Sequence, residues 1–259
     1  MSSLLDMLWV EGRKAWRSRM PLWTALGSQF LPLGLAFLIF IAKHPELSQK
    51  LGLVSAKANL VAYSATDWPT YLGVYGGAIG AGGLILFIFV LSWIFGREFS
   101  DGTLKDWLAV PVPRTTILLA KFIVGAIWSA GLTVVIFAGG LITGALLQLP
   151  GGSLAVLWQG AALVLVTSSL VVVAVLPAAL LASLGRGYLL PIGIAVLMIF
   201  GINLSMILGL GEYFPWAVPI LYAEGKSPLP TVSYAIVFVT GLLGVLATVW
   251  WWQTADQNR

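Results

Sequence analysis

Long apolar stretches without a charged residue alternate along this chain with short charged segments. The charge-free runs cover residues 20–42, 68–96, 122–185, 187–211 and 227–255. A helix needs about 20 apolar residues to cross the hydrocarbon core of a bilayer, so four of these runs predict one membrane span each. The run 122–185 predicts two spans, because Pro150 and the glycines that follow it would break a helix in its middle.

The pattern therefore predicts an all-α polytopic membrane protein, with six transmembrane helices in one domain over residues 1–259. A β-barrel would instead show alternating segments of about ten residues. We place the spans at about 22–42, 71–95, 117–148, 153–184, 189–209 and 231–252. Pro177 should kink the fourth span, because proline removes a backbone hydrogen bond. Residues 210–230 are rich in proline and aromatic residues, and we expect short broken helices that re-enter the outer leaflet.

An amphipathic helix is predicted at residues 3–20, lying along the membrane surface as an interface helix. One face holds Leu4, Leu5, Leu8, Trp9, Gly12, Ala15 and Trp16, and the other holds Asp6, Arg13, Lys14 and Arg17. Basic and tryptophan side chains suit the lipid headgroup region. The helix is either a topogenic anchor or an interface element that also touches a cytoplasmic partner. Trp9, Arg13 and Trp16 are the candidate contact residues. The run Trp250 to Trp252 is typical of an aromatic anchor at the inner interface.

Composition and charge fix the membrane class and the expected topology. Only 9% of the residues are charged, against about 25% in soluble domains. With six spans both termini share one side, and the opposite side holds only Lys43, Lys50, Lys57 and Lys226 of the 14 Lys and Arg residues. The positive-inside rule then predicts a multi-pass plasma-membrane protein with both termini in the cytoplasm. The positive charges follow the topology, so they indicate membrane lipids and no nucleic acid as partners.

Several kinds of chemistry are absent from the sequence. There is no cysteine, hence no disulfide and no thiolate metal site, and no catalytic or metal-binding residue is predicted. The apolar runs contain no ionisable residue, whereas ion-coupled carriers place such groups within the membrane. No nucleotide-binding P-loop of the form GxxxxGK[ST] occurs. We therefore expect no enzymatic activity and no bound cofactor, and any energy for transport must come from another polypeptide.

A short charged island stands out against this background. Seven ionisable residues lie between Arg97 and Lys121. Ser100 or Asp101 can cap a short helix, which Pro111 would stop. The sequence predicts a rigid helix at about 101–110 between spans two and three, presenting charge to the cytoplasm. A connecting loop stiffened by prolines is the alternative.

The island, GREFSDGTLKDWLAVPVPRTTILLAK, resembles the signature of ABC-2 type transporter permeases. The matching positions are Glu98, Gly102, Thr103, Pro111, Arg114 and Lys121. The predicted interface helix, six spans, cytoplasmic termini and outer segment agree with that family along nearly the whole chain. The small size resembles the bacterial drug- and bacteriocin-resistance permeases.

The resemblance implies a transmembrane subunit of an ABC exporter. Two permease copies, as a homodimer or with a related chain, would bind two cytoplasmic ABC ATPase subunits, and these would hold ATP and Mg. The segment 101–110 would be a coupling helix inserted into the ATPase, with the interface helix beside it. The implied coupling residues are Glu98, Ser100, Asp101, Gly102, Thr103, Leu104, Lys105, Leu108, Pro111 and Arg114. Glu98 and Arg114 could form an ion pair.

The second and fifth spans carry the candidate dimer or pathway residues. Gly73 with Gly77, and Gly76 with Gly80, form two GxxxG pairs in the second span, which serve either packing within the chain or a subunit interface. Asn203 and Ser205 add polar groups to the fifth. A pathway without charge favours an amphipathic or apolar cargo such as a drug, peptide or lipid. The alternatives are an ATP-independent facilitator or channel, and an assembly or regulatory subunit that transports nothing.

Overall fold

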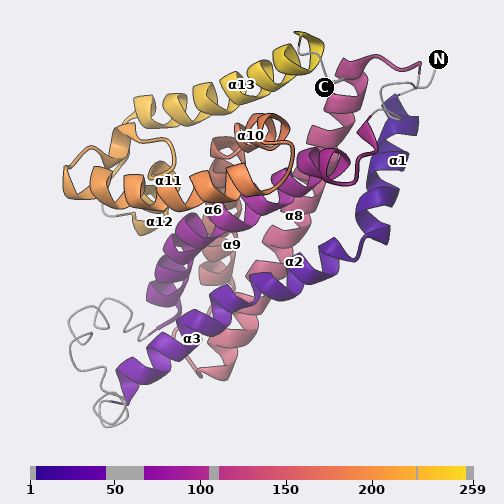
Figure 1. The fold of residues 1–259 in the computed structure, drawn as a ribbon. Coiled ribbons are helices and arrows are strands. Elements are labelled where there is room, and N and C mark those ends of the chain that lie inside the picture. Colours follow the sequence, from indigo (N-terminus) through magenta and orange to yellow (C-terminus); the bar gives the residue numbers. More distant parts are fainter. Residues whose placement is uncertain (1–3, 45–66, 105–110, 226, 255–259) are drawn as a thin grey trace.

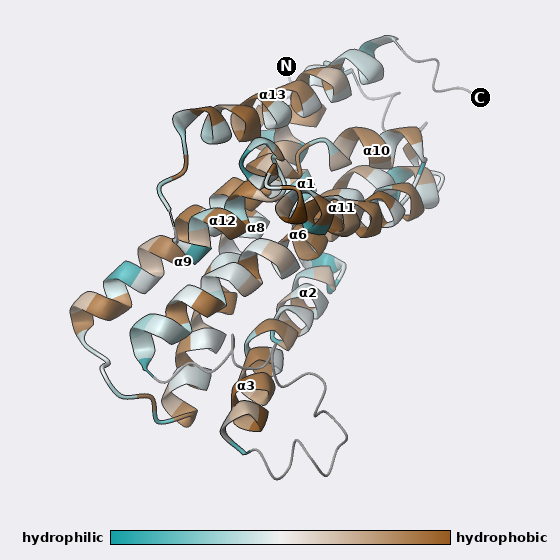
Figure 2. Cartoon of the chain, turned by 90° about the vertical axis from the view of Figure 1, so that its left-hand side faces the viewer, coloured by the Kyte–Doolittle hydropathy of each residue, from teal (hydrophilic) through white to brown (hydrophobic). Residues whose placement is uncertain are grey.

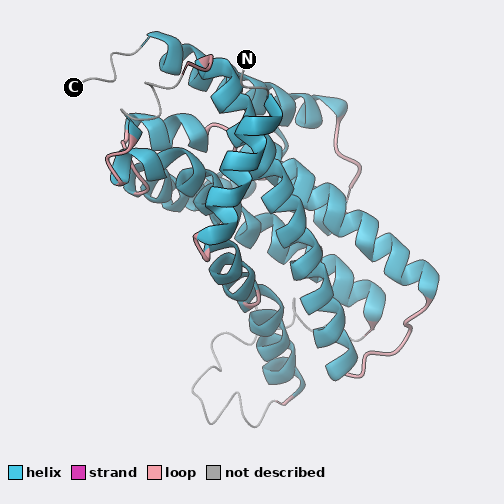
Figure 3. Cartoon of the chain, turned by 90° about the vertical axis from the view of Figure 1, so that its right-hand side faces the viewer, coloured by secondary structure: helices cyan, strands magenta, loops and turns pink. Residues whose placement is uncertain are grey.

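A computed structural model describes residues 4–44, 67–104, 111–225 and 227–254 of the chain. These residues form helices joined by short connections, and none of them lies in a strand (Figure 1, Figure 3). The helices are α1 (Leu4–Arg17), α2 (Met20–Ser28), α3 (Phe30–Lys43), α6 (Trp68–Ser100), α8 (Arg114–Leu146), α9 (Leu154–Ala174), α10 (Ala178–Leu184), α11 (Leu189–Ile207), α12 (Val218–Glu224) and α13 (Thr231–Thr254), with a 3-10 helix η3 (Gly211–Tyr213).

Six segments of the described chain are long and apolar enough to cross a membrane: α2 with α3, then α6, α8, α9 with α10, α11 and α13. Hydrophobic residues follow these helices along their length (Figure 2). The prediction of an all-α polytopic membrane protein is confirmed. Helices α6 and α8 each contain 33 residues and are therefore about 50 Å long. Because a hydrocarbon core is about 30 Å thick, parts of both helices must lie outside it.

One end of the bundle gathers the charged island and the two ends of the described chain. The last turn of α6 is bonded to α1 through Lys14 and Glu98. The first residue of α8, Arg114, is bonded to the last turn of α13 at Trp252. We call this end the terminal end. The far end holds the start of α6 and the connection between α8 and α9, where the Trp68 amide donates to the Pro150 carbonyl.

Helix α6 is the central helix of the bundle. It packs against α8, α9, α10, α11 and α12. Within its most apolar window 67% of the residues are buried, against 22% in α11 and 28% in α13. Tyr71 and Tyr75 tie α6 to α8, because their hydroxyls donate to the carbonyls of Gly140 and Ile136. The outer surface of the molecule is therefore formed largely by α3, α11 and α13.

Two of the spans are interrupted. Gln29 separates α2 from α3, and Pro32 has no amide to continue the hydrogen-bond ladder. The first span, predicted as one helix over residues 22–42, is thus two helices that follow one another almost in line (Figure 1). In the fourth span, residues 175–177 separate α9 from α10, and Pro177 precedes the first residue of α10. Helix α13 fills this break, where Gly244 lies directly against Pro177.

The segment 210–230, in which the sequence predicts broken helices, contains η3 and α12. Ala217 and Val218 are fully buried at the start of α12. Trp216 donates its indole N–H to the Ala174 carbonyl, which the break after α9 leaves available. The interpretation of Trp250 to Trp252 as one aromatic anchor is wrong for its last member. Trp250 is exposed, but Trp252 is 1% exposed and donates to Ser183 Oγ.

Candidate functional site: a buried ion cluster at the terminal end

Helix α1 packs against α8 with a face that differs from the predicted one. Its buried residues are Met7, Glu11 and Ala15, whose spacing of four places them on one side of a helix. Trp9 and Trp16, assigned to the apolar face, are 63% and 81% exposed. The stripe that packs on the protein is thus distinct from the Trp-containing apolar face of the sequence pattern, and an acidic residue lies in its middle.

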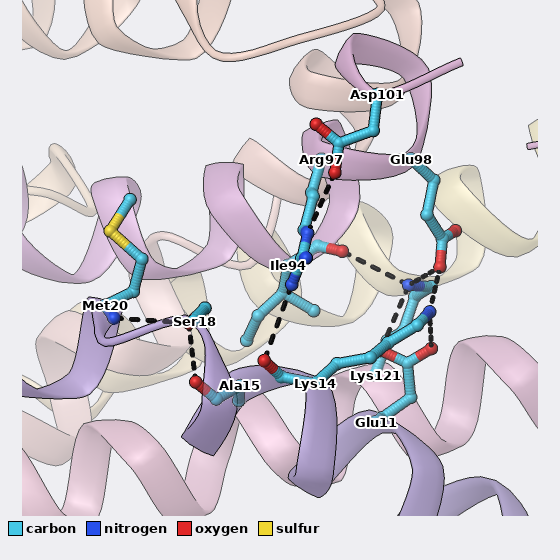
Figure 4. A network of polar contacts seen from close by, with 10 residues as sticks. All are labelled: Glu11, Lys14, Ala15, Ser18, Met20, Ile94, Arg97, Glu98, Asp101 and Lys121. Atoms are coloured by element: carbon cyan, nitrogen blue, oxygen red, sulfur yellow. Dashed lines mark hydrogen bonds and ion pairs between the residues drawn. The ribbon is translucent and has the colours of Figure 1, made fainter. Parts of the chain in front are cut away.

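Four charged side chains from α1, α6 and α8 meet in a single cluster (Figure 4). Lys121 Nζ donates to Glu98 Oε1 at 2.9 Å and to Glu11 Oε2 at 3.3 Å. Lys14 Nζ donates to Glu98 Oε1 at 2.6 Å and to Glu11 Oε1 at 3.0 Å. A third bond from Lys121 reaches the Ile94 carbonyl at 3.2 Å. We call Glu11, Lys14, Glu98 and Lys121 the ion cluster.

The ion cluster is buried and electrically balanced. Lys121 is 1% exposed, Glu98 3% and Glu11 5%, while Lys14 at 24% forms the edge toward the surface. Two carboxylates face two ammonium groups, so the formal charges cancel. All three donors of Lys121 are satisfied, which offsets much of the cost of removing its charge from water. Glu98 Oε2 is buried without a hydrogen-bond partner among the described residues.

The chain leaves α6 through a glycine turn built on the same glutamate. Gly102 has φ 69°, in the left-handed region. Its amide donates to the Phe99 carbonyl, and the Thr103 amide donates to the Glu98 carbonyl. This pair of bonds is the Schellman motif, in which glycine adopts the left-handed conformation without a Cβ clash. The Gly-Thr of the island therefore ends α6, and Glu98 holds the turn by its backbone and the ion cluster by its side chain.

The predicted N-terminal cap of a new helix at Ser100 or Asp101 is not formed. Ser100 is the last residue of α6 and Asp101 is its C-cap. The Asp101 carboxylate accepts from Arg97 Nε at 3.0 Å instead. Arg97 also donates to the Lys14 carbonyl at 3.4 Å, which adds a second link between α6 and α1.

Other members of the predicted coupling set divide into buried, exposed and undescribed residues. Leu104 is 7% exposed and packs in the same core as Ala15 and Leu118, so its side chain faces the interior of this chain. Asp101, Gly102, Thr103 and Pro111 are exposed. Lys105, Leu108 and the rest of the predicted coupling helix fall at residues 105–110, outside the described residues.

Arg114 does not pair with Glu98, contrary to the sequence-based expectation. Its Nη1 donates to the Trp252 carbonyl at 2.6 Å. Glu98 is instead occupied by Lys14 and Lys121. Arg114 thus ties the start of α8 to the last turn of α13, where basic side chains suit the exposed carbonyls of a helix C-terminus.

The glycines of the second span fall into two pairs with different surroundings. A Cβ added at Gly80 would lie 3.0 Å from the backbone of Ile220, and one at Gly76 would lie 3.2 Å from the Cβ of Ala223. These two glycines therefore let α6 pack against α12 within the same chain. A Cβ at Gly73 or Gly77 would meet nothing within 4 Å.

Asn203 and Ser205 face different environments on α11. Asn203 is exposed and donates to the Ile199 carbonyl. Ser205 is buried and donates to the Ile202 carbonyl. The two polar groups therefore do not form one site within the chain.

Sequence reasoning missed Glu11 as a member of the cluster. It also missed that Lys14 and Lys121 each form ion pairs with Glu11 and Glu98. The available signal was a glutamate at four-residue spacing between Met7 and Ala15, which puts a charge on a buried face. Within the described ranges, no group of three His, Asp or Glu side chains could hold a metal ion. The ion cluster joins three helices immediately beside an exposed turn.

Comparisons with known proteins identify the family of the chain. A family described as ABC-2 family transporter protein matches residues 7–202. The chain is also 33% identical over 78 residues to the bacitracin transport permease protein BCRB of Bacillus licheniformis. That match covers 30% of this chain and 38% of the relative, so it spans little more than a third of the relative's length. The family match begins within α1, ends within α11 and includes every residue of the ion cluster. The chain belongs to the ABC-2 family of transporter proteins.

Proposed function

We propose that this permease exports an amphipathic or apolar cargo from the cytoplasm, using ATP that a separate ATPase subunit hydrolyses. Two permease copies would work with two ATPase subunits, and ATP and Mg would be held by the ATPases. The observation that carries the proposal is the junction at the terminal end. There the exposed turn Asp101–Thr103 continues directly from the ion cluster that joins α1, α6 and α8.

A force applied at this turn would reach the whole bundle. Thr103 is bonded to the Glu98 carbonyl, and the Glu98 side chain is held by Lys14 and Lys121. Glu98 lies on α6, which packs against α2, α3 and α8 to α12. Because packed helices move as rigid bodies, a displacement of the turn would move α6 together with α1 and α8. A motor protein docked at residues 101–113 would therefore drive the central helix.

The lack of an energising group in the membrane supports an external motor. Between the ion cluster and the far end, α6 and α8 carry no Asp, Glu, Lys or Arg. Proton- and ion-coupled carriers depend on such groups within the bilayer. The relative's name concerns bacitracin transport, so a peptide antibiotic is the first cargo to test.

Site-specific crosslinking tests the docking of the ATPase. A photoreactive amino acid at exposed Thr103 should crosslink an ABC ATPase subunit that is co-expressed and co-purifies with the permease. The matched control is Leu154, which is 72% exposed at the far end and should give no crosslink. Equal crosslinking at both positions, or none at Thr103 with a co-purifying ATPase, would contradict docking at the terminal end.

Reconstituted transport separates the proposal from its alternatives. Vesicles containing both subunits should move bacitracin or a member of a drug panel only when ATP is present. Flux without the ATPase would instead identify a facilitator or channel. A stable complex that hydrolyses ATP but moves no member of the panel would favour an assembly or regulatory subunit.

A further inference from the structure

A groove separate from the ion cluster runs between α1, α2 and α8. Its volume is about 480 Å³, within the range of about 300–1,000 Å³ that is usual for ligand pockets. The lining residues are Leu8, Gly12, Ala15, Trp16, Pro21, Ala25, Val124, Ile127, Trp128, Gly131, Leu132 and Val135. None of them carries a charge, so the groove suits a hydrocarbon chain.

Two of the lining glycines leave the groove open. A Cβ added at Gly12 on α1 or at Gly131 on α8 would meet nothing within 4 Å. Elsewhere in this bundle glycines such as Gly80 and Gly244 allow a neighbouring backbone to approach closely. Gly12 and Gly131 do not serve such an approach, and larger residues at either position would fill the groove.

The length and position of the groove match one leaflet. Along α8 it extends from Val124 to Val135, a rise of about 16 Å at 1.5 Å per residue. That is about half of a hydrocarbon core of about 30 Å. The groove begins one turn beyond Lys121, and its rim residue Ile127 is 66% exposed on a membrane-spanning helix. A lipid chain of the leaflet at the terminal end can therefore enter from the side.

Exposed arginines adjoin the groove in sequence, because Arg13 follows Gly12, Arg17 follows Trp16 and Arg19 stands two residues before Pro21. Arg13, Arg17 and Arg19 are exposed on α1 and on the link to α2, and within the described part of the chain none of the three forms an ion pair. Trp16 lines the mouth, and Trp9 stacks under the Arg13 guanidinium at 4.8 Å. Tryptophan and basic side chains are typical of the headgroup level. The backbone of Arg19 has φ 60°. Glycine would adopt this left-handed conformation with less strain than arginine.

We propose that the groove binds an anionic phospholipid, with one acyl chain between α1, α2 and α8 and the headgroup at Arg13, Arg17 and Arg19. The lipid completes the packing of α1 against the bundle. Its binding is independent of the ATPase and of the cargo. The ion cluster fixes one side of α1, and the lipid fixes the adjoining side.

Native mass spectrometry of the purified full chain tests the proposal. The protein is equilibrated in nanodiscs of equal parts phosphatidylglycerol and phosphatidylcholine, and the lipid that stays bound after release is counted. Wild type should retain phosphatidylglycerol in preference to phosphatidylcholine. Gly12→Leu/Gly131→Leu should retain about tenfold less lipid, a loss of about 1.4 kcal/mol in binding. The control Gly27→Leu, on α2 with nothing within 4 Å and outside the groove, should bind as wild type does.

The headgroup is tested separately. Arg17→Gln/Arg19→Gly should keep a bound lipid but lose the preference for phosphatidylglycerol, and the glycine should fold at least as well as Arg19. Size-exclusion profile and melting temperature verify the fold of each variant. Lipid retention by Gly12→Leu/Gly131→Leu equal to wild type would overturn the proposal. One-for-one displacement of the lipid by bacitracin would also overturn it, because the groove would then bind cargo. So would a Gly12→Leu/Gly131→Leu variant that loses a dimer while its lipid binding is unchanged, because the groove would then bind a second copy.

Discussion

At the scale of single residues, Lys121 is the most consequential side chain of the terminal end. It is 1% exposed and contacts both carboxylates of the ion cluster. Replacing it with methionine would leave Glu98 and Glu11 buried with one cation between them. Loss of one partner from a buried ion pair costs about 3–5 kcal/mol. We expect Lys121→Met to lower the melting temperature in detergent strongly and to release α1 from the bundle.

Two comparisons isolate the electrostatic part of this effect. Asp101→Asn removes only the pair with Arg97, whose side chains are 47% and 33% exposed, and it should cost no more than about 1 kcal/mol. Lys121→Met/Glu98→Gln leaves one cation and one anion in the cluster, so it should be more stable than the sum of the single changes implies, by about 0.5–3 kcal/mol. Additive losses would show that Lys121 acts by packing alone.

Gly102 is the second residue-scale determinant, because its φ of 69° ends α6 within the exposed turn Asp101–Thr103. Alanine in this conformation should cost about 1–2 kcal/mol. Asparagine tolerates the left-handed region better, so Gly102→Asn should recover part of the loss. Thermal unfolding and ATPase co-purification measure both effects. Equal behaviour of the two variants would contradict the backbone explanation.

The sequence could identify Glu98, Gly102 and Lys121 as a set, but not their partners. Glu11 and Lys14 lie 110 and 84 residues from the groups they bind, and no local pattern encodes a contact across that distance. The helical rotation of α1 decides which charge is buried. The apolar face with Trp9, Trp16 and Leu8 does not show which side of α1 packs against α8, because tryptophan is stable at a lipid interface as well as in a core.

At the scale of elements, the six apolar segments were predictable from the length of their charge-free runs. The breaks within the first and fourth spans were harder to predict. Pro177 marks the break between α9 and α10, whereas the break at Gln29 comes three residues before Pro32, where the sequence predicts one continuous helix. The end of α6 and the start of α8 extend past the apolar runs into the island, because ion pairs satisfy charged residues there. Hydropathy alone cannot predict how far these two helices extend.

Packing of α6 against α12 gives the element-scale prediction. A Cβ added at Gly80 would lie 3.0 Å from the Cα of Ile220. Gly80→Leu must therefore displace the α12 backbone. Overpacking of this kind costs about 1–3 kcal/mol or more. Gly77→Leu, one turn earlier in the chain, meets nothing within 4 Å and should be tolerated within the chain. Expression yield and melting temperature of the two variants should therefore differ.

The same pair of variants also examines the subunit interface. If Gly77 lies at a contact with a second permease copy, Gly77→Leu should keep the melting temperature of the monomer and shift the oligomeric state in native mass spectrometry. An unchanged oligomeric state would exclude Gly77 from the interface. A Gly80→Leu variant as stable as wild type would contradict the packing of α6 against α12.

At the scale of the whole molecule, the terminal end must face the cytoplasm if an ATPase is to dock there. Arg13, Arg17 and Arg19 lie at this end, and the positive-inside rule places them in the cytoplasm. The chain contains no cysteine, so single cysteines report accessibility without background. Thr103→Cys at the terminal end should react with a membrane-impermeant maleimide only after cells are opened. Leu154→Cys at the far end should react in intact cells.

The labelling pattern depends on the fold as well as on the orientation. Val90 on α6 is 0% exposed, so Val90→Cys should stay unlabelled in opened cells, which verifies that the reagent reports the folded protein. A reversed pattern, with Thr103→Cys labelled from outside, would keep the bundle but place the ion cluster and its turn beyond the reach of any cytoplasmic motor. The role that we propose for the ion cluster in ATP-driven export therefore depends on this one measurement of sidedness.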